Sequence, residues 1–155
     1  LNAGINVLYS GTVAAAIEGA FFGMTSVAVS LEYDDAARYD VAAQQAAKII
    51  QQILAHPNTE RQLFNLNIPS CSLDHPAEVH VVPMATAPWG ENFEKRTDPR
   101  GLSYYWATGM APDPPTHQET DLSALRAGHI TLTPLQFDMT HQANLQQMQT
   151  WQLQA

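Results

Sequence analysis

A short polar segment, Ser10-Gly11-Thr12, precedes a run of small apolar residues that continues to Ala20. The run is rich in alanine, so it predicts a helix that Ser10 or Thr12 can cap. The first turn of a helix leaves backbone N–H groups unpaired and carries a partial positive charge, and the glycine lets a ligand approach closely. The pattern suits a phosphate, although an ordinary capped helix has it too. The segment is not a P-loop, because no Gly-Lys-Ser or Gly-Lys-Thr follows.

The other potential metal or redox ligands do not form a recognisable motif. No two of the six histidines have the H-x-H or H-x-x-x-H spacing of zinc ligands, and Cys71 has no second thiol with which to pair. We therefore expect surface or loop histidines and a reducing compartment, the cytoplasm. The pair Asp34-Asp35 lies in a polar stretch that we interpret as a solvated loop. The histidines are His56, His75, His80, His117, His129 and His141.

Residues 95–101 gather three of the seven basic residues into one turn-forming segment, next to Tyr104-Tyr105-Trp106. Arginine and aromatic side chains together can face an anionic ligand that carries a base, or they can anchor a contact between subunits. The sequence leaves both interpretations open.

The composition excludes one class of partner. The chain has 155 residues, with 7 Lys plus Arg against 15 Asp plus Glu and a formal net charge of -8. So acidic a chain is not expected to bind a nucleic-acid polymer through its phosphates. Charged residues make up 14% and hydrophobic residues 45%, as in a folded protein. Residues 11–31 are the longest apolar stretch, but Glu18 and small polar residues interrupt it, so we expect a buried helix and strand, not a membrane span.

The first half of the chain alternates helical and extended patterns. Residues 25–31 are β-branched and bounded by glycine and polar residues, which predicts a strand buried on both faces of a parallel sheet. Residues 40–55 have apolar positions at helical spacing and predict an amphipathic helix that ends before Pro57. Residues 63–69 alternate apolar and amide side chains and predict a second strand.

From Val79 onward the pattern changes to short extended pieces typical of hairpins, at residues 79–82, 93–95, 103–106 and 129–133. The proline-rich residues 110–117 must form a loop or arm. A short helix is expected at 121–127, capped by Thr120 or Asp121, and a last one after Thr140. We therefore divide the chain into residues 1–82, where helices and strands alternate, and residues 83–155, a hairpin-rich portion with a C-terminal arm.

Five blocks of this sequence, taken in order, resemble the SurE survival-protein family. The blocks run from Asn2 to about Thr140 at close to the family's spacing. They are Asn2-Ala3-Gly4; Tyr9-Ser10-Gly11-Thr12 with the alanine-rich run to residue 19; Asn65-Leu66-Asn67-Ile68-Pro69; Lys95-Arg96-Thr97-Asp98-Pro99-Arg100-Gly101 with Tyr104-Tyr105-Trp106; and Thr131-Leu132-Thr133-Pro134-Leu135.

The resemblance implies a Rossmann-like α/β fold, a three-layer parallel sheet with helices, and a C-terminal β-hairpin extension for oligomerisation. Residues 1–82 then correspond to the C-terminal part of the phosphatase domain, and residues 83–155 to the oligomerisation portion with its C-terminal arm. It implies metal-dependent hydrolysis of nucleoside monophosphates, as in 5'/3'-nucleotidases and acid phosphatases. Asn2 then corresponds to a metal ligand, and Ser10, Gly11 and Thr12 to the segment that binds the substrate phosphate. Carboxylate and amide ligands suit Mg or Mn better than zinc.

Two departures from the family pattern qualify this assignment. The family's Asn-Asp-Asp segment, which supplies two metal-binding aspartates, and a later serine ligand have no counterpart here, and the loop between Asn6 and Tyr9 is shorter. We therefore expect the sequence to be the C-terminal portion of a longer protein. The resemblance implies a homodimer or a homotetramer and does not choose between them. The alternative function is a non-catalytic phosphate-binding or oligomerisation module.

Overall fold

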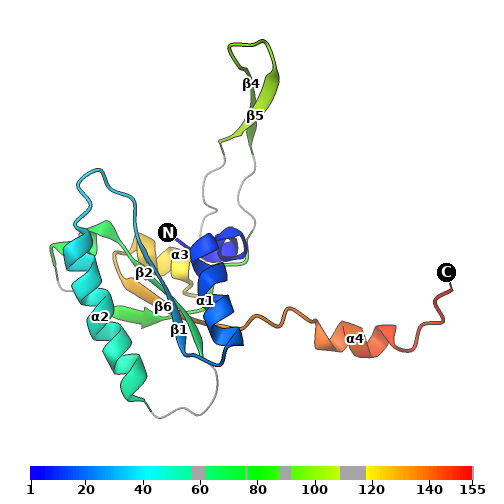
Figure 1. Ribbon diagram of the computed structural model, residues 1–155, viewed down its shortest axis with the longest axis horizontal. Coiled ribbons are helices and arrows are strands. Elements are labelled where there is room, and N and C mark those ends of the chain that lie inside the picture. The colour runs from blue at the N-terminus through cyan, green and yellow to red at the C-terminus, as the bar shows by residue number, and fades with distance from the viewer. Residues whose placement is uncertain (57–61, 76, 88–91, 109–117, 155) are drawn as a thin grey trace.

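The computed structural model describes residues 1–56, 62–75, 77–87, 92–108 and 118–154. Its centre is a four-stranded sheet in the order β1-β2-β6-β3 (Figure 1). Strand β1 (Ser26–Leu31) pairs in parallel with β2 (Leu63–Ile68), and β3 (Val79–Val81) pairs in parallel with β6 (Ile130–Leu135). The central pair β2–β6 is antiparallel. The expected parallel pairing is thus found on both sides of one antiparallel junction.

Helices cover the two faces of this sheet, as the three-layer prediction requires. Helix α1 (Gly11–Phe21) packs on the face that carries Ala28 and Leu63, and α2 (Tyr39–Ala55) packs on the opposite face against Leu66 and Ile68. A third helix, α3 (Asp121–Arg126), packs with Leu122 and Leu125 against Ala3 of the N-terminal segment. Both the α1 and α2 predictions are confirmed to within one or two residues.

The predicted burial of the first strand is wrong. In β1 only Ala28 is buried, and the other residues are partly or fully exposed. The reason is that β1 pairs with β2 alone and forms an edge of the described sheet. Strand β2, which has neighbours on both sides, is the buried one, and its Leu66, Asn67 and Ile68 have no exposed surface.

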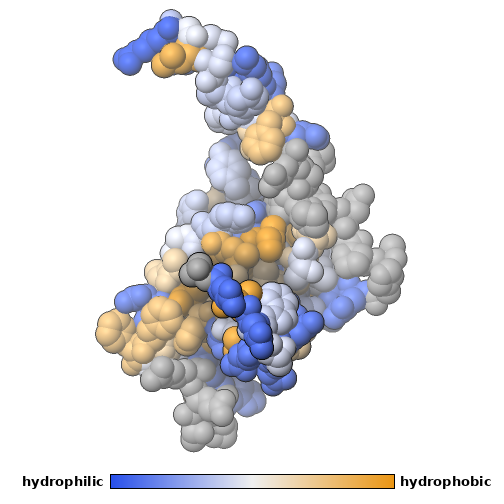
Figure 2. All heavy atoms as spheres, turned by 90° about the vertical axis from the view of Figure 1, so that its right-hand side faces the viewer, coloured by the Kyte–Doolittle hydropathy of each residue, from blue (hydrophilic) through white to orange (hydrophobic). Residues whose placement is uncertain are grey.

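A separate antiparallel hairpin is formed by β4 (Phe93–Thr97) and β5 (Ser103–Ala107). It stands away from the sheet in Figure 1, and Figure 2 shows polar and apolar side chains mixed along it. Every residue of both strands is exposed. Residues 129–133, in contrast, do not belong to a hairpin: β6 lies inside the main sheet, because it pairs with β2 and β3 at the same time.

The remaining elements are short. Short 3-10 helices occupy Gly4–Tyr9 and Ser70–Leu73, and α4 (Gln142–Met148) lies apart from the sheet (Figure 1). The predicted loop at residues 110–117 lies outside the described residues. Within the described ranges, no helix combines the length and the hydropathy that a membrane crossing requires.

Candidate phosphate-binding site

The N-terminus of α1 lies toward the carboxyl end of β1. Near the other end of the helix, Gly19 lies directly against Ser26, the first residue of β1, since a Cβ atom on Gly19 would be 2.5 Å from Ser26 Oγ. Helix and strand therefore run in opposite directions, as Figure 1 shows. In open α/β sheets this edge, outside the carboxyl ends of parallel strands, is where ligands bind.

Ser10 is the N-cap of α1, as predicted. Its Oγ accepts a hydrogen bond from the Val13 amide at 3.1 Å and donates one to Asn2 Oδ1 at 2.7 Å. The serine therefore brings Asn2 to the start of the helix. Its hydroxyl proton is already engaged by the asparagine, so its direct role is to hold these two parts of the site together.

Gly11 and Thr12 form the exposed first turn of α1. Their two amides donate no hydrogen bond within the described part of the chain, as expected for a helix N-terminus. No atom lies within 4 Å of the position that a Gly11 Cβ would occupy, so the backbone faces open space. Two amides and the Thr12 hydroxyl are thus available to an anion.

Asn2 is fixed by two asparagines of β2. Its amide donates to Asn67 Oδ1 at 2.9 Å, and its carbonyl accepts from the Nδ2 atoms of both Asn65 and Asn67. Both of these side chains are fully buried. In the sequence these asparagines stand out only as part of a motif, because their hydrogen bonds to Asn2 span 63 and 65 residues.

The asparagine cluster contains unsatisfied atoms. Asn2 Nδ2 and Asn65 Oδ1 are buried and have no partner among the described residues. A buried polar atom without a hydrogen bond costs about 1–3 kcal/mol, so such atoms are uncommon in folded proteins and tend to have a functional reason. They mark the surroundings of Asn2 as a polar centre beneath the helix terminus.

A divalent metal finds too few ligands here. Asn2 Oδ1 accepts from Ser10 and keeps one lone pair that could ligate an ion. Asp121, the buried carboxylate near this segment, uses its oxygens on the amides of Gly4, Ala85 and Leu122. Mg²⁺ requires about six oxygen ligands in octahedral geometry, including its waters. The described residues of the predicted site therefore do not form a metal centre by themselves.

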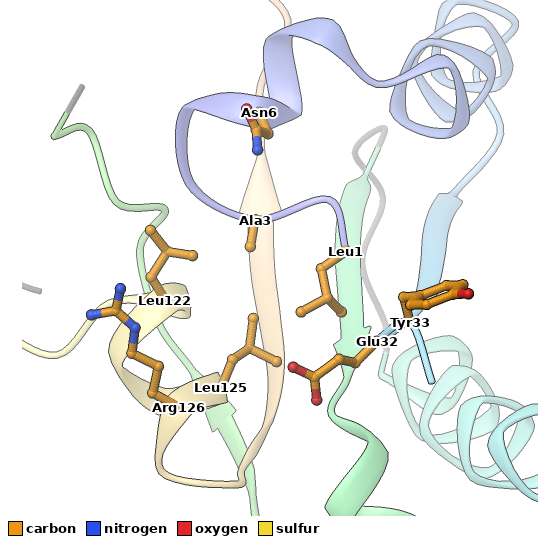
Figure 3. Close-up of a pocket in the computed structure, with 8 residues that line it drawn as sticks. All are labelled: Leu1, Ala3, Asn6, Glu32, Tyr33, Leu122, Leu125 and Arg126. Atoms are coloured by element: carbon orange, nitrogen blue, oxygen red, sulfur yellow. The ribbon is translucent and has the colours of Figure 1, made fainter. Parts of the chain in front are cut away.

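An open pocket of about 400 Å³ adjoins the Asn2 segment. Leu1 and Ala3, on either side of Asn2, line it together with Leu122 and Leu125 of α3 (Figure 3). Glu32 and Tyr33 lie across from Arg126 in this view. The walls of the pocket are therefore apolar, and charged side chains lie at its rim. The residues that line the pocket are Leu1, Ala3, Asn6, Glu32, Tyr33, Leu122, Leu125 and Arg126.

The basic segment at residues 95–101 forms the hairpin and its turn, away from Asn2. Arg96 donates to the Glu94 carboxylate at 2.7 Å, and its guanidinium lies 5.2 Å from the centre of the Trp106 ring. Its charge is therefore balanced within the hairpin. The remaining aromatic surface is exposed, with Tyr105 at 66% and Trp106 at 53%.

A mixed α/β sheet, helices on both faces and a polar centre at a helix N-terminus define an α/β protein with a candidate phosphate site. Comparison with known families is more specific. The family described as "Survival protein SurE" matches residues 1–91, and the chain belongs to this family.

Individual relatives agree with this assignment. The chain is 54% identical over 153 residues to a 5'-nucleotidase SurE of Rhodopirellula baltica, with 99% of this chain and 60% of the relative covered. It is 42% identical to the 5'-nucleotidase SurE of Crocosphaera subtropica, covering 96% and 57%. The crystal structure of a SurE protein from Aquifex aeolicus superposes with a TM-score of 0.81 at 26% identity, covering 96% and 60%. The chain thus spans between half and two thirds of these relatives' length.

Proposed function

We propose that the intact protein is a metal-dependent phosphomonoesterase that hydrolyses nucleoside monophosphates. The observation that carries this proposal is the exposed first turn of α1, where Gly11 and Thr12 present free amides beside Asn2. The names of the relatives, 5'-nucleotidase SurE, supply the substrate class. They favour an enzyme over a non-catalytic phosphate-binding or oligomerisation module.

Each residue of the site has a distinct role in this proposal. The amides of Gly11 and Thr12 and the Thr12 hydroxyl donate hydrogen bonds to the phosphate oxygens, where negative charge accumulates during transfer. Ser10 caps the helix and orients Asn2. Asn65 and Asn67 hold the backbone of Asn2, so the carboxamide stays in place when a ligand binds.

The metal, which we propose to be Mg or Mn, would polarise the phosphate and activate water when bound. Asn2 Oδ1 offers one ligand for it. The others would correspond to the family's Asn-Asp-Asp segment, which has no counterpart in this sequence. Catalysis is therefore proposed for the intact protein and not for these 155 residues alone.

We also propose a homodimer or homotetramer in the cytoplasm. The hairpin, α4 and the residues after α4 support an assembly, because large apolar side chains lie exposed on all three, among them Phe93 at 57%, Met148 at 45% and Leu153 at 76%. Exposed apolar patches of this kind mark interaction sites. Cys71, unpaired in the structure, suits a reducing compartment.

The test is phosphatase activity of the full-length protein on nucleoside monophosphates and on p-nitrophenyl phosphate, with Mg²⁺, Mn²⁺ or a chelator. We expect turnover that requires the metal and that falls at least about tenfold in Thr12→Val, which keeps the side-chain shape and loses the hydroxyl. Ser123→Ala is a matched control, since Ser123 lies in the capping box of α3. Absence of metal-dependent turnover in the wild-type protein would contradict the proposal and favour the non-catalytic phosphate-binding or oligomerisation module.

A further inference from the structure

A second group of potential ligands lies where β3 and β6 begin. These strands are parallel with Val79 opposite Ile130, so the residues that precede them, Glu78 and His129, are neighbours. The His80 and His129 rings stack with centres 3.9 Å apart and planes inclined by 11°. One ligand atom from each of Glu78, His80 and His129 lies within 4.8 Å of the others. The expectation of surface or loop histidines is therefore wrong for His80, which lies in β3 and is partly buried, because strand pairing brings it next to a histidine that is distant in sequence.

The hydrogen bonds of His80 orient one ring nitrogen for a cation. Its Nδ1 lies 2.9 Å from a Glu119 carboxylate oxygen and its Nε2 lies 3.4 Å from a Glu78 oxygen. In the neutral ring Nδ1 donates to Glu119, so the lone pair of Nε2 faces another lone pair on Glu78. The hydrogen bond to Glu119, chiefly, raises the pKa of His80 above its ordinary value. Two carboxylates around one imidazole favour positive charge at this point.

The cluster is reached from solvent through a separate pocket. This pocket, of about 410 Å³, is lined by Glu78 and His129 together with Cys71 and His75. Glu78 is 82% exposed and His80 is 23% exposed. An ion can enter without unfolding of the strands, and the glutamate is free to turn toward it.

We propose that Glu78, His80 and His129 bind a divalent transition-metal ion of the zinc class, with Glu119 as the positioning residue that holds His80. Two imidazoles and one carboxylate are a donor set that suits Zn²⁺, and a carboxylate on the second ring nitrogen is the usual support of a metal-bound histidine. Oxygen-preferring Mg²⁺ is not expected to compete.

Binding of an ion requires the side chains of the cluster to rearrange. Zn–N bonds of about 2.0–2.1 Å place two nitrogen ligands of a tetrahedral ion about 3.3 Å apart. Ligand atoms within 4.8 Å of one another must approach by up to about 1.5 Å, and the stacked imidazole rings must tilt so that both nitrogen lone pairs point at the ion. Glu78 precedes the edge strand β3, His80 lies within it, and His129 precedes β6, so the ion would join these two strands at the edge of the sheet.

This site shares no residue with the phosphate site and does not depend on the proposed function. Asn2, Ser10 and Thr12 belong to the N-terminal segment and α1. The cluster consists of one residue of β3, the residues directly before β3 and β6, and the residue before the α3 cap. Loss of one site can therefore be measured with the other intact.

The test is isothermal titration of the untagged protein with Zn²⁺, and with Mg²⁺ as a second ligand. We expect one Zn²⁺ per chain, a melting temperature that rises by several degrees at saturating Zn²⁺, and no heat from Mg²⁺ at this site. Affinity should fall at least about tenfold in His80→Ala and in His129→Ala, and about tenfold or more in Glu119→Gln. His56→Ala removes an exposed histidine elsewhere and should change nothing.

Binding of Co²⁺ gives a second readout, because its visible absorption strengthens when the ion leaves octahedral water for a tetrahedral protein site. The signal should appear in the wild-type protein and be lost in His129→Ala. If a histidine variant is poorly folded by circular dichroism, His80→Gln takes its place. The proposal is overturned if the wild-type protein does not bind Zn²⁺ or if both histidine variants keep the full affinity. The cluster would then bind only a proton, on His80.

Discussion

The Gly4 amide donates a hydrogen bond of 2.7 Å to Oδ2 of Asp121, which follows it by 117 residues. The other carboxylate oxygen accepts from the amides of Ala85 and Leu122, each at 2.8 Å. One fully buried side chain thus joins the N-terminal segment, the residues after β3 and the start of α3. The segment that carries Asn2 is therefore anchored at two points, by Asp121 and by the asparagines of β2.

Replacement of Asp121 by asparagine should destabilise the protein by about 1–3 kcal/mol. The new NH2 group cannot accept, so at least one buried backbone N–H loses its partner. Urea unfolding followed by circular dichroism measures the change. Asp138→Asn serves as control: Asp138 is exposed and accepts from the Thr140 amide, so its loss should stay within about 0.5 kcal/mol. Equal stability of the two variants would contradict the proposed anchor.

Gly4 and Gly11 should respond in opposite ways to alanine. Gly4 has a φ of +57°, and an added Cβ would lie 3.0 Å from Leu122 Cδ1 and 3.3 Å from the Ala85 carbonyl oxygen. We expect Gly4→Ala to cost at least about 1–2 kcal/mol, the penalty of the left-handed conformation alone.

Gly11 lies in the helix with open space around it, so Gly11→Ala should leave stability unchanged or slightly improved. It should instead raise the KM of the full-length protein for a phosphate monoester about tenfold, since the new methyl group stands where the phosphate approaches; tenfold corresponds to about 1.4 kcal/mol. A normal KM in this variant would argue against binding at the α1 terminus.

Local patterns predicted most elements and few of the contacts between them. The Ser10 cap, α2 and the hairpin strands depend on residues close in sequence, and all were predicted. Strand β6 lies between β2 and β3. Its antiparallel pairing with β2 joins residues that are more than 60 positions apart, and no local periodicity encodes such a pairing.

The same limit applies to side chains. Of the two predicted caps of α3, Thr120 is the cap, whereas Asp121 accepts hydrogen bonds from the distant amides of Gly4 and Ala85, which no local pattern indicates. His80 and His129 have no ligand spacing and meet only because their strands are adjacent. The hydrogen bond between Ser10 and Asn2, in contrast, could have been predicted, because the two residues belong to neighbouring motifs near the N-terminus.

Ser10→Ala and Thr12→Ala should separate stability from binding. Loss of the N-cap oxygen should cost about 1 kcal/mol, whereas Ser10→Gly should cost only a few tenths. Thr12 is exposed and its hydroxyl has no partner in the described structure, so Thr12→Ala should leave stability nearly unchanged. In the full-length protein both should slow phosphate-ester hydrolysis, Thr12→Ala by loss of a donor and Ser10→Ala by release of Asn2. Thermal unfolding and kinetics on the same samples distinguish these effects, and unaltered kinetics in the double variant would dismiss the site.

The C-terminal helix offers a test of assembly. No residue of α4 is buried, and Leu145 and Met148 lie three positions apart on one face at 41% and 45% exposure. If this face packs on another subunit, Leu145→Glu with Met148→Glu should lower the mass seen by light scattering, because two charges would enter an apolar contact. Removal of residues 141–155 should do the same. Gln146→Glu with Gln147→Glu adds equal charge on the opposite face and should leave the mass unchanged. A mass that all three variants share with the wild-type protein would exclude α4 from the interface and leave the β4–β5 hairpin as the remaining candidate.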